Sequence, residues 1–276
     1  MKEERIKRVL LIVGIVLTVS FCLLPFIYMV MVSFAKNADF LSLSSRYVFT
    51  VNNYKEVLFN ANLHFLDYLK NSAIVSVVGA GVAVLLGSLA AFSITRLPLP
   101  FKGLVLFVTL SMSMFPQVSL VGFLFSFMTK LGWINTYLAL IFPYIAWVLP
   151  LSLWILVSYF ASIPRDIDKQ AFIDGCSSWQ ILFKVIWPLA RPGIFSTFLL
   201  AFIFSFNEFM FALLFTTDHR TRTVPVGIAL FQGLHGEIPW GTIMAAATVS
   251  TLPIIVLVLV FQRNIIQGLT RGAVKG

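Results

Sequence analysis

The chain of 276 residues is 59% hydrophobic and 11% charged, and its net charge is +9. A soluble domain normally carries about 25% charged residues, so this composition excludes a soluble globular protein and indicates a membrane protein. Its length suits about six helices of roughly 20 apolar residues each, with loops between them. The basic residues are spread over the loops, which argues against a nucleic-acid-binding domain.

Six apolar stretches predict the transmembrane helices of an all-α, polytopic membrane protein. The first follows the basic sequence KEERIKR and continues through Pro25 without a small-residue cleavage site, so we expect an uncleaved helix rather than a signal peptide. No sizeable soluble domain interrupts the series, and residues 1–276 are predicted to form a single transmembrane domain. The predicted spans are residues 9–35, 71–95, 103–129, 131–164, 192–217 and 238–262.

The lysines and arginines predict the orientation of these spans. The N-terminus, the loop between the second and third spans, the 165–191 region and the C-terminal tail together hold 13 of the 20 lysines and arginines. Basic loops remain on the cytoplasmic side, so both termini and the 165–191 region are expected in the cytoplasm. Residues 36–70, the TKLGWINT turn and residues 216–240 are expected to face outward.

The loop at about 162–191 is predicted to be a helix–turn–helix. Pro164 suits a first-turn position, where no backbone donor is needed. Asp166 and Asp168 then lie at the positive end of the helix dipole. Gly175 is expected to end this helix in a left-handed conformation.

A second helix in this loop is predicted to run to Pro188. Ser177 and Gln180 have the spacing of a capping box at its start. A lipid-surface amphipathic helix is one interpretation of the loop. Sparse basic residues and the tight glycine turn favour docking into a groove on another protein. The apolar face is expected to comprise Ala171, Phe172, Cys176 and Ile181.

This loop resembles the cytoplasmic EAA loop of ABC-importer permeases, which has the pattern E-A-A-x-x-D-G-A followed by L-P-x-x-x-P. Lys169 and Gln170 depart from the pattern, because they stand where the family has Glu and the first Ala. The sequences PQVSLVGFLFSFMTKLGWINTYLALI and SFNEFMFALLF are similar to the carbohydrate branch of the family. The ending QRNIIQGLTRGAVKG is similar to the second permease of maltose-type importers. The matching loop positions are Ala171, Asp174, Gly175, Pro188, Leu189 and Pro192.

The resemblance implies a permease subunit of an ATP-driven importer for a sugar or oligosaccharide, in a bacterial or archaeal inner membrane. It implies three protein partners: a cytoplasmic ATP-binding subunit, a second homologous permease and an extracytoplasmic sugar-binding protein. Asp174 is expected either to contact the ATPase or to cap the following helix. The residues that the resemblance places in the ATPase-coupling loop are Ala171, Asp174, Gly175, Cys176 and Pro188.

Two other regions are candidates for function. Asn207 and Glu208 are polar within the fifth span, where an acid tends to face a cavity or a partner. They are expected to line the pathway or a gate, or else to make a structural hydrogen bond between packed helices. The apolar centre of the 216–240 loop predicts an exposed contact surface for the binding protein or a segment lying in the membrane interface. The candidate contact residues there are Val226, Gly227, Gln232 and Gly233.

No catalytic constellation is visible. The chain has no Gly-Lys dipeptide and therefore no Walker A loop, so ATP is expected to bind a partner and no cofactor is expected here. The three histidines, His64, His219 and His235, show no metal-binding spacing, and Cys22 and Cys176 do not form a disulfide framework. A stand-alone secondary transporter is the main alternative, but such proteins typically show internal repeats and several intramembrane charges.

Overall fold

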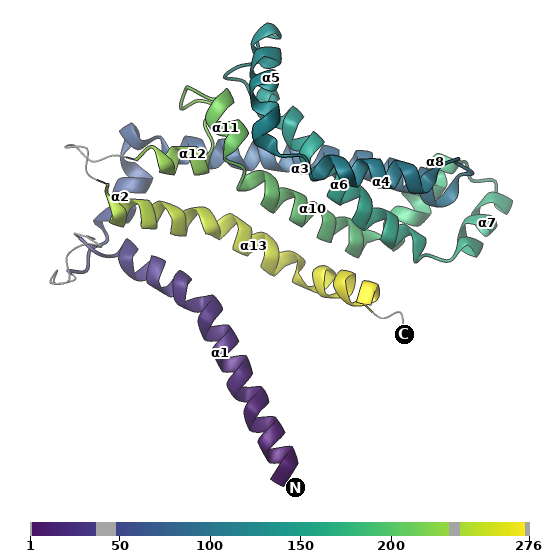
Figure 1. Ribbon diagram of the computed structural model, residues 1–276, viewed down its shortest axis with the longest axis horizontal. Coiled ribbons are helices and arrows are strands. Elements are labelled where there is room, and N and C mark those ends of the chain that lie inside the picture. Colours follow the sequence, from purple (N-terminus) through teal and green to yellow (C-terminus); the bar gives the residue numbers. More distant parts are fainter. Residues whose placement is uncertain (1, 37–47, 232–237, 274–276) are drawn as a thin grey trace. The chain divides into compact units, whose positions relative to one another are not determined.

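The computed structural model describes residues 2–36, 48–231 and 238–273, and side chains within residues 4–36, 48–231 and 238–262 (Figure 1). Within these ranges the chain is helical, with a single β-bridge between Ala35 and Phe49. This confirms the all-α class. The elements are α1 (Lys2–Ser33), α2 (Asn52–Phe59), η1 (Ala61–Leu63), α3 (Phe65–Arg96), α4 (Lys102–Ser113), α5 (Gln117–Lys130), α6 (Tyr137–Ala161), α7 (Arg165–Ile173), α8 (Ser178–Gln180), η2 (Ile181–Ile186), α9 (Trp187–Leu189), α10 (Arg191–Phe206), α11 (Met210–Phe215), α12 (Val224–Ala229) and α13 (Trp240–Ala273).

Among the described residues, four helices are long and apolar enough to cross a membrane: α1, α3, α6 and α13. Two sharply bent helix pairs bring the number to six if each pair is one span. Helices satisfy every internal backbone donor and acceptor within one segment, which a lipid environment requires. The chain is therefore a multi-pass membrane protein.

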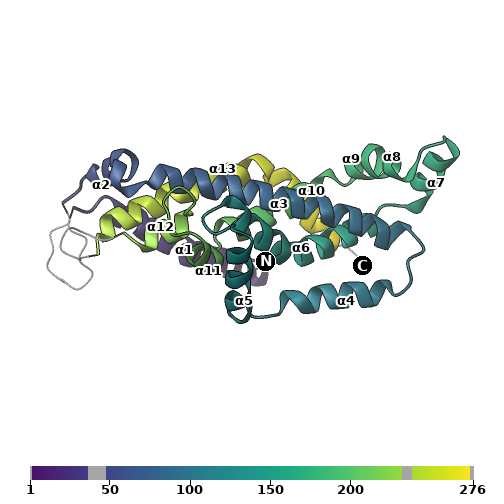
Figure 2. The same ribbon diagram turned by 90° about the horizontal axis from the view of Figure 1, so that it is seen from above.

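The predicted third span, residues 103–129, is not one straight helix. It consists of α4 and α5, which meet at 87° (Figure 2). The break falls at Pro116, the N-cap of α5, whose φ is −63°. Proline has no backbone N–H and its ring crowds the preceding turn, so α4 cannot continue through it. Hydropathy alone did not reveal the bend because both arms are apolar.

The predicted fifth span, residues 192–217, is also interrupted. The helix α10 ends at Phe206, and α11 begins at Met210 after a break at 207–209. At its other end α10 makes an angle of 82° with the helical stretch that ends at Leu189. The polar pair Asn207–Glu208 was the sequence signal for the first of these breaks.

The chain forms two compact units, which are described separately. The first comprises residues 1–65 and 228–252. In this unit the amide of Asn53 donates to the carbonyls of Ser33 and Ala35 at 2.8 and 2.9 Å. The hydroxyl of Thr242 donates to Glu56 Oε2 at 3.2 Å. These bonds connect the end of α1, α2 and the start of α13.

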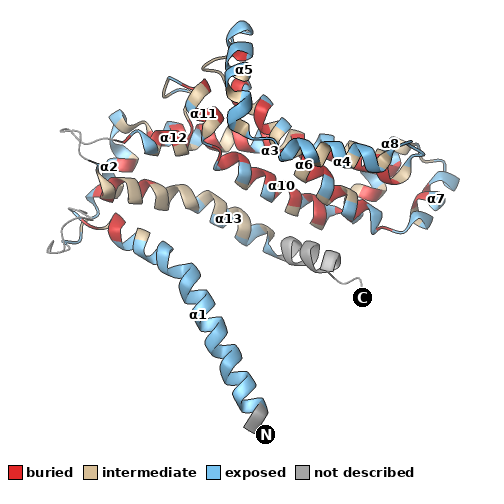
Figure 3. Ribbon diagram, viewed as in Figure 1, coloured by how far each residue is buried: buried red, intermediate tan, exposed pale blue. Residues whose placement is uncertain are grey.

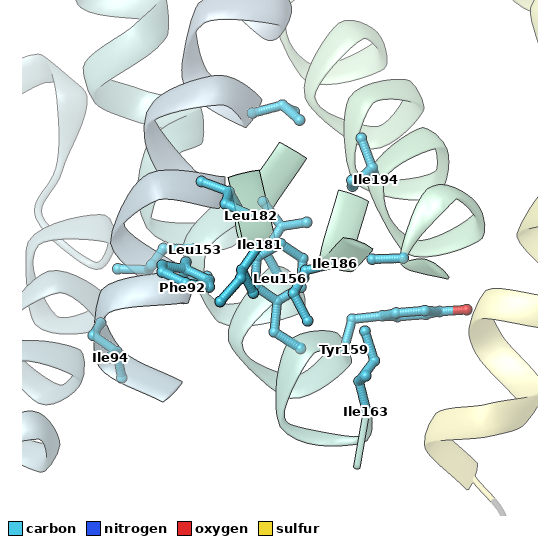
Figure 4. Packing of buried hydrophobic residues seen from close by; sticks show 14 of the residues in the cluster. Phe92, Ile94, Leu153, Leu156, Tyr159, Ile163, Ile181, Leu182, Ile186 and Ile194 are labelled. Carbon is cyan, nitrogen blue, oxygen red and sulfur yellow. The ribbon is translucent and has the colours of Figure 1, made fainter. Parts of the chain in front are cut away.

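The second unit comprises residues 66–227 and 253–276. Buried residues occur along the length of α6 and α10 (Figure 3). One cluster joins α3, α6 and η2: Phe92 meets Leu153 and Leu156 of α6 and Ile181 of η2 (Figure 4). Because Leu156 and Ile181 are fully buried, the loop after α6 is part of the packed core rather than a free linker.

The helices α6 and α10 approach closely at Gly193. A Cβ added there would lie 2.4 to 2.7 Å from ring atoms of Tyr159. Real Cβ atoms do not come that close, so the ring of Tyr159 uses the space that any other residue at position 193 would fill.

Candidate functional site

The 162–191 segment begins with α7, which Gly175 ends. Gly175 has a φ of +81°, the left-handed region that glycine adopts at little cost. The Gly175 N–H donates to Phe172 O at 3.0 Å, and the Cys176 N–H donates to Ala171 O at 2.9 Å. These two bonds are the Schellman pattern at a helix C-terminus, and they confirm the predicted stop. Pro164 is the N-cap, one position earlier than predicted.

A capping box opens the second helical stretch, as predicted. The Ser177 hydroxyl accepts from the Gln180 N–H at 3.4 Å, and the Gln180 side chain accepts from the Ser177 N–H at 2.8 Å. Ser177 therefore caps this stretch, and Asp174, which lies exposed at the C-cap of α7, does not. The helix continues through the π-helical turns of η2, a rare conformation that is often found at functional sites.

The apolar residues of the segment divide into two groups. Ala171 and Ile181 are buried and Cys176 is half-buried. Phe172 was predicted on the same face but is 56% exposed, and its neighbour Ile173 is 84% exposed. The reason is the helical period: successive residues of α7 point in different directions, so of residues 171–173 only Ala171 meets the core. The exposed tip of the segment thus combines two apolar side chains with a fixed glycine turn.

A buried ion pair joins α7 to α3. Arg96 Nε lies 2.8 Å from Asp168 Oδ2, and the two side chains are only 6% and 11% exposed. Arg96 Nη2 also donates to Ile163 O at 3.0 Å, and Arg165 Nη2 donates to Thr95 O at 2.8 Å. Burial raises the pKa of the Asp168 carboxyl, and the charges of Arg96 and Arg165 oppose that shift.

Sequence reasoning missed this pair, because Arg96 and Asp168 lie in different predicted loops. Asp168 was assigned only to the helix dipole. The available signal was an arginine directly after the second predicted span and an acid on a short helix on the same predicted side of the membrane. Lys169, which departs from the family pattern, is exposed and pairs with Asp166 at 2.9 Å. That hydrogen bond lowers the pKa of Asp166.

Glu208 caps α11. Its two carboxylate oxygens accept from the Phe211 N–H at 2.9 Å and the Ala212 N–H at 3.2 Å. Glu208 therefore bonds to the first turn of the following helix, and its carboxylate also interacts with the Tyr144 side chain of α6. The carboxylate is buried, and these two bonds compensate part of the cost of removing it from water.

Asn207 and Glu208 also line a pocket of about 430 Å³ in the second unit. The pocket has three further features: the half-buried Trp147 of α6, Gln117 at the start of α5, and apolar side chains around the break. An aromatic ring beside amide and carboxylate groups offers both an apolar surface and hydrogen-bonding groups to a polar ligand. The residues that line it are Gln117, Trp147, Ile203, Phe204, Asn207, Glu208, Phe209 and Met210.

Part of the apolar 216–240 loop packs inside the chain. Val226 is fully buried, and a Cβ on Gly227 would lie 2.1 Å from Tyr68 Cδ2. The expectation of an exposed apolar surface is therefore wrong for these two residues. Val226 packs in a core cluster, and Gly227 lies against the ring of Tyr68. Gln232 and Gly233 lie outside the described residues.

The start of this loop is fixed to α3. Asn71 Nδ2 donates to the carbonyls of His219 and Arg222 at 3.2 and 2.9 Å, and Ser72 Oγ accepts from the Val224 N–H at 2.8 Å. The Tyr137 hydroxyl donates to Asn71 Oδ1 at 2.7 Å. Asn71 is 2% exposed, and both its amide nitrogen and its amide oxygen are hydrogen-bonded.

The spans, the polar pocket at a helix break and the structured loop between α6 and α10 together characterise a multi-pass membrane protein. The family of binding-protein-dependent transport system inner membrane components matches residues 83–271. The chain is 56% identical, over the full length of both proteins, to the trehalose/maltose transport system permease protein MalG of Thermococcus litoralis. It is 41% identical to the trehalose transport system permease protein SugB of Mycobacterium tuberculosis, over 82% of each chain.

Solved structures show the same fold. A chain of a bacterial ABC transporter involved in the import of the acidic polysaccharide alginate superposes with a TM-score of 0.75 at 18% identity, covering 95% of this chain and 98% of that one. The alginate transporter in complex with an alginate pentasaccharide-bound periplasmic protein gives a TM-score of 0.63 at 16% identity, covering 94% of each chain.

The chain belongs to the family of binding-protein-dependent transport system inner membrane components. The resemblance to carbohydrate ABC-importer permeases is thereby confirmed. The family is one of permeases, not of enzymes, and membership does not favour a stand-alone secondary transporter.

Proposed function

We propose that this chain is a permease subunit of an ATP-driven sugar importer and forms half of the translocation pathway. The observation that carries the proposal is the full-length identity of 56% to a trehalose/maltose permease. A second relative, at 41% identity, is named as a trehalose permease. Both names refer to glucose disaccharides, so a disaccharide of glucose is the substrate class to test first.

The proposed ATPase contact is the exposed tip of the 162–191 segment. Phe172 and Ile173 are exposed apolar side chains on a short helix whose end is fixed by Gly175. An apolar helix tip of fixed direction suits docking into a groove on a soluble partner. Ala171, Cys176 and Pro188 would then support the tip, while Asp174, which caps neither helix with its side chain, is free for the partner.

The proposed pathway residues are those of the pocket beside Asn207 and Glu208. A second, homologous permease would supply the other half of the pathway, because about six spans line only one side of a channel. The sugar-binding protein would deliver substrate at the outer face, where residues 216–240 are expected. The proposed topology places both termini in the cytoplasm, in accordance with the charge distribution.

The test is reconstitution. The chain is incorporated into liposomes either alone or with a second permease and an ATPase subunit from the same transport system. Binding protein and labelled trehalose or maltose are supplied on the outer side. We expect uptake only in the complete system and only with ATP inside, because the chain has no phosphate-binding loop of its own.

The control is the same liposomes with an imposed proton or sodium gradient in place of ATP. Uptake by the chain alone, driven by the gradient and indifferent to ATP, would replace the importer proposal with a secondary transporter. Uptake of an unrelated sugar by the complete system, but not of trehalose or maltose, would overturn the substrate class alone.

A further inference from the structure

The helix α3 makes polar contacts with functional loops at both of its ends. At its C-terminal end, Arg96 forms the buried ion pair with Asp168, and the Thr95 carbonyl accepts from Arg165. Two independent contacts therefore fix the last turn of α3 to the first turns of α7. Figure 2 shows this end of α3 at the same end of the second unit as α7 and α8.

At the N-terminal end, α3 holds the 216–224 segment. Asn71 and Ser72 bond three backbone groups of that segment at 2.8 to 3.2 Å. Backbone groups bonded to a buried side chain follow that side chain when its helix moves. The position of the segment is thus fixed by the first turns of α3.

The two ends are connected by uninterrupted helix. α3 contains no proline, and Asn71 and Arg96 are separated by a rise of roughly 37 Å at 1.5 Å per residue. A continuous helix of this length is stiff along its axis, so a displacement at one end appears at the other. Neither loop contact alone would connect the two faces of a membrane.

A contribution to the stability of the fold does not explain why Arg96 and Asp168 form a buried ion pair. Removing two charges from water offsets most of their attraction, so an apolar pair of similar size would stabilise the fold as well or better. This pair also leaves Asp168 Oδ1 buried without a hydrogen-bond partner. Its distinctive property is that it fixes α7 in one position on α3, which a non-directional apolar contact would not do.

We propose that α3 is the strut that couples the 162–191 segment to the 216–224 segment, with Arg96 and Asp168 as positioning residues at one end and Asn71 at the other. The proposal rests on the proposed function, in which an ATPase moves the first segment and a sugar-binding protein acts on the face of the second. In this role none of these three residues touches sugar or ATP. They make the two binding events act on one element, as linkage between distant sites requires.

The experiment measures how strongly sugar-loaded binding protein stimulates ATP hydrolysis in the reconstituted complex. For Asp168→Asn we expect the ratio of stimulated to basal ATPase activity to fall roughly tenfold, within the range usual for coupling between sites. Sugar transported per ATP should fall as well. Asp166→Asn is the matched control, because this acid lies on the same helix two residues away but is exposed and pairs only with Lys169; it should leave the ratio unchanged.

A second pair of variants tests the outer end. Asn71→Leu removes the amide that holds His219 and Arg222 and should lower the same ratio. Ser76→Ala is its control, because Ser76 is buried in the same helix with a hydroxyl that has no hydrogen-bond partner. Thermal unfolding and recovery of each complex are measured alongside, so that a loss of folding is distinguished from a loss of coupling.

The deciding measurement is the double variant Asp168→Asn with Asn71→Leu. Substitutions more than about 10 Å apart normally have additive effects. A strut predicts that the second substitution lowers the ratio little further, because the two ends act in series and a weakened contact at one end already limits the motion that reaches the other. If Asp168→Asn does not assemble, Asp168→Glu, which keeps the charge but displaces it, replaces it in the same cycle.

Fully additive effects, or a ratio in the Asp168 variant equal to that of the unmodified chain, would overturn the strut. Failure of the unmodified complex to show any stimulation would instead overturn the proposed function. Recovery of coupling by exchanging the charges, Arg96→Asp with Asp168→Arg, would further support the ion pair as the contact that transmits motion.

Discussion

At the scale of single residues, the turn at Gly175 gives the most direct prediction. We expect Gly175→Val to reduce sugar-stimulated ATPase activity without removing the protein from the membrane. A left-handed backbone costs a side-chain-bearing residue roughly 1–2 kcal/mol, while a Cβ there would meet no atom within 4 Å. The penalty is therefore conformational strain confined to the tip of the segment. Membrane abundance and ATPase stimulation are measured side by side.

The control for this substitution is Gly175→Asn, because asparagine tolerates the left-handed region better than a β-branched residue does. It should keep most of the stimulation. Normal stimulation in the valine variant would show that the turn is not needed for coupling.

Single residues were predictable from sequence where their role is local. Gly175 and the Ser177–Gln180 capping box are determined by neighbours within a few positions, so their spacing was sufficient. The Arg96–Asp168 pair depends on how α3 and α7 meet, which no local pattern encodes. Val226 was misjudged for the same reason: its apolar side chain fits either an exposed contact or a core, and the fold decides for the core.

At the scale of elements, the break between α10 and α11 makes Glu208 a structural group as well as a candidate pathway residue. We expect Glu208→Ala to lower the free energy of unfolding by about 1–3 kcal/mol, because it leaves two backbone donors of the first turn of α11 unpaired. The measurement is thermal unfolding of the purified protein in detergent.

Asn207→Ala is the neighbouring control. Asn207 is exposed and bonds only to Ile203 O one turn back, so its loss should change stability by less than about 0.5 kcal/mol. Equal melting temperatures of Asn207→Ala and Glu208→Ala would contradict the capping role of Glu208.

The elements themselves were predictable to the extent that hydropathy determines them. The six apolar stretches were visible because lipid imposes long apolar runs. The helical loop was visible from its proline, its glycine stop and its capping-box spacing. The bend at Pro116 was not visible, and Glu208 was recognised only as a polar residue within the fifth span. A window average responds to composition and is insensitive to a change of direction, so a bent span and a straight one have the same profile.

At the scale of the whole molecule, the charge distribution gives a prediction of topology. We expect Arg220→Cys to react with a membrane-impermeant thiol reagent in intact cells, and Ile173→Cys to react only after the membrane is opened. Both positions are exposed in this chain, and the cells lack the ATPase subunit, so failure to react would reflect the membrane rather than burial or a bound partner. Cys22 and Cys176 are replaced by serine beforehand, since neither forms a disulfide.

The control is the cysteine-less chain, which should remain unlabelled in both conditions. Labelling of Ile173→Cys in intact cells, together with protection of Arg220→Cys, would reverse the orientation and remove the ATPase contact from the 162–191 segment.

The close approach of α6 and α10 has a consequence for how this protein can change over evolutionary time. The ring of Tyr159 occupies the space beside Gly193 in which any side chain would begin. A methyl group at position 193 is therefore acceptable only in a lineage that has already lost the ring at 159, and a ring can be gained at 159 only opposite glycine. The two positions form a single inherited unit, and substitutions at them have to follow one order.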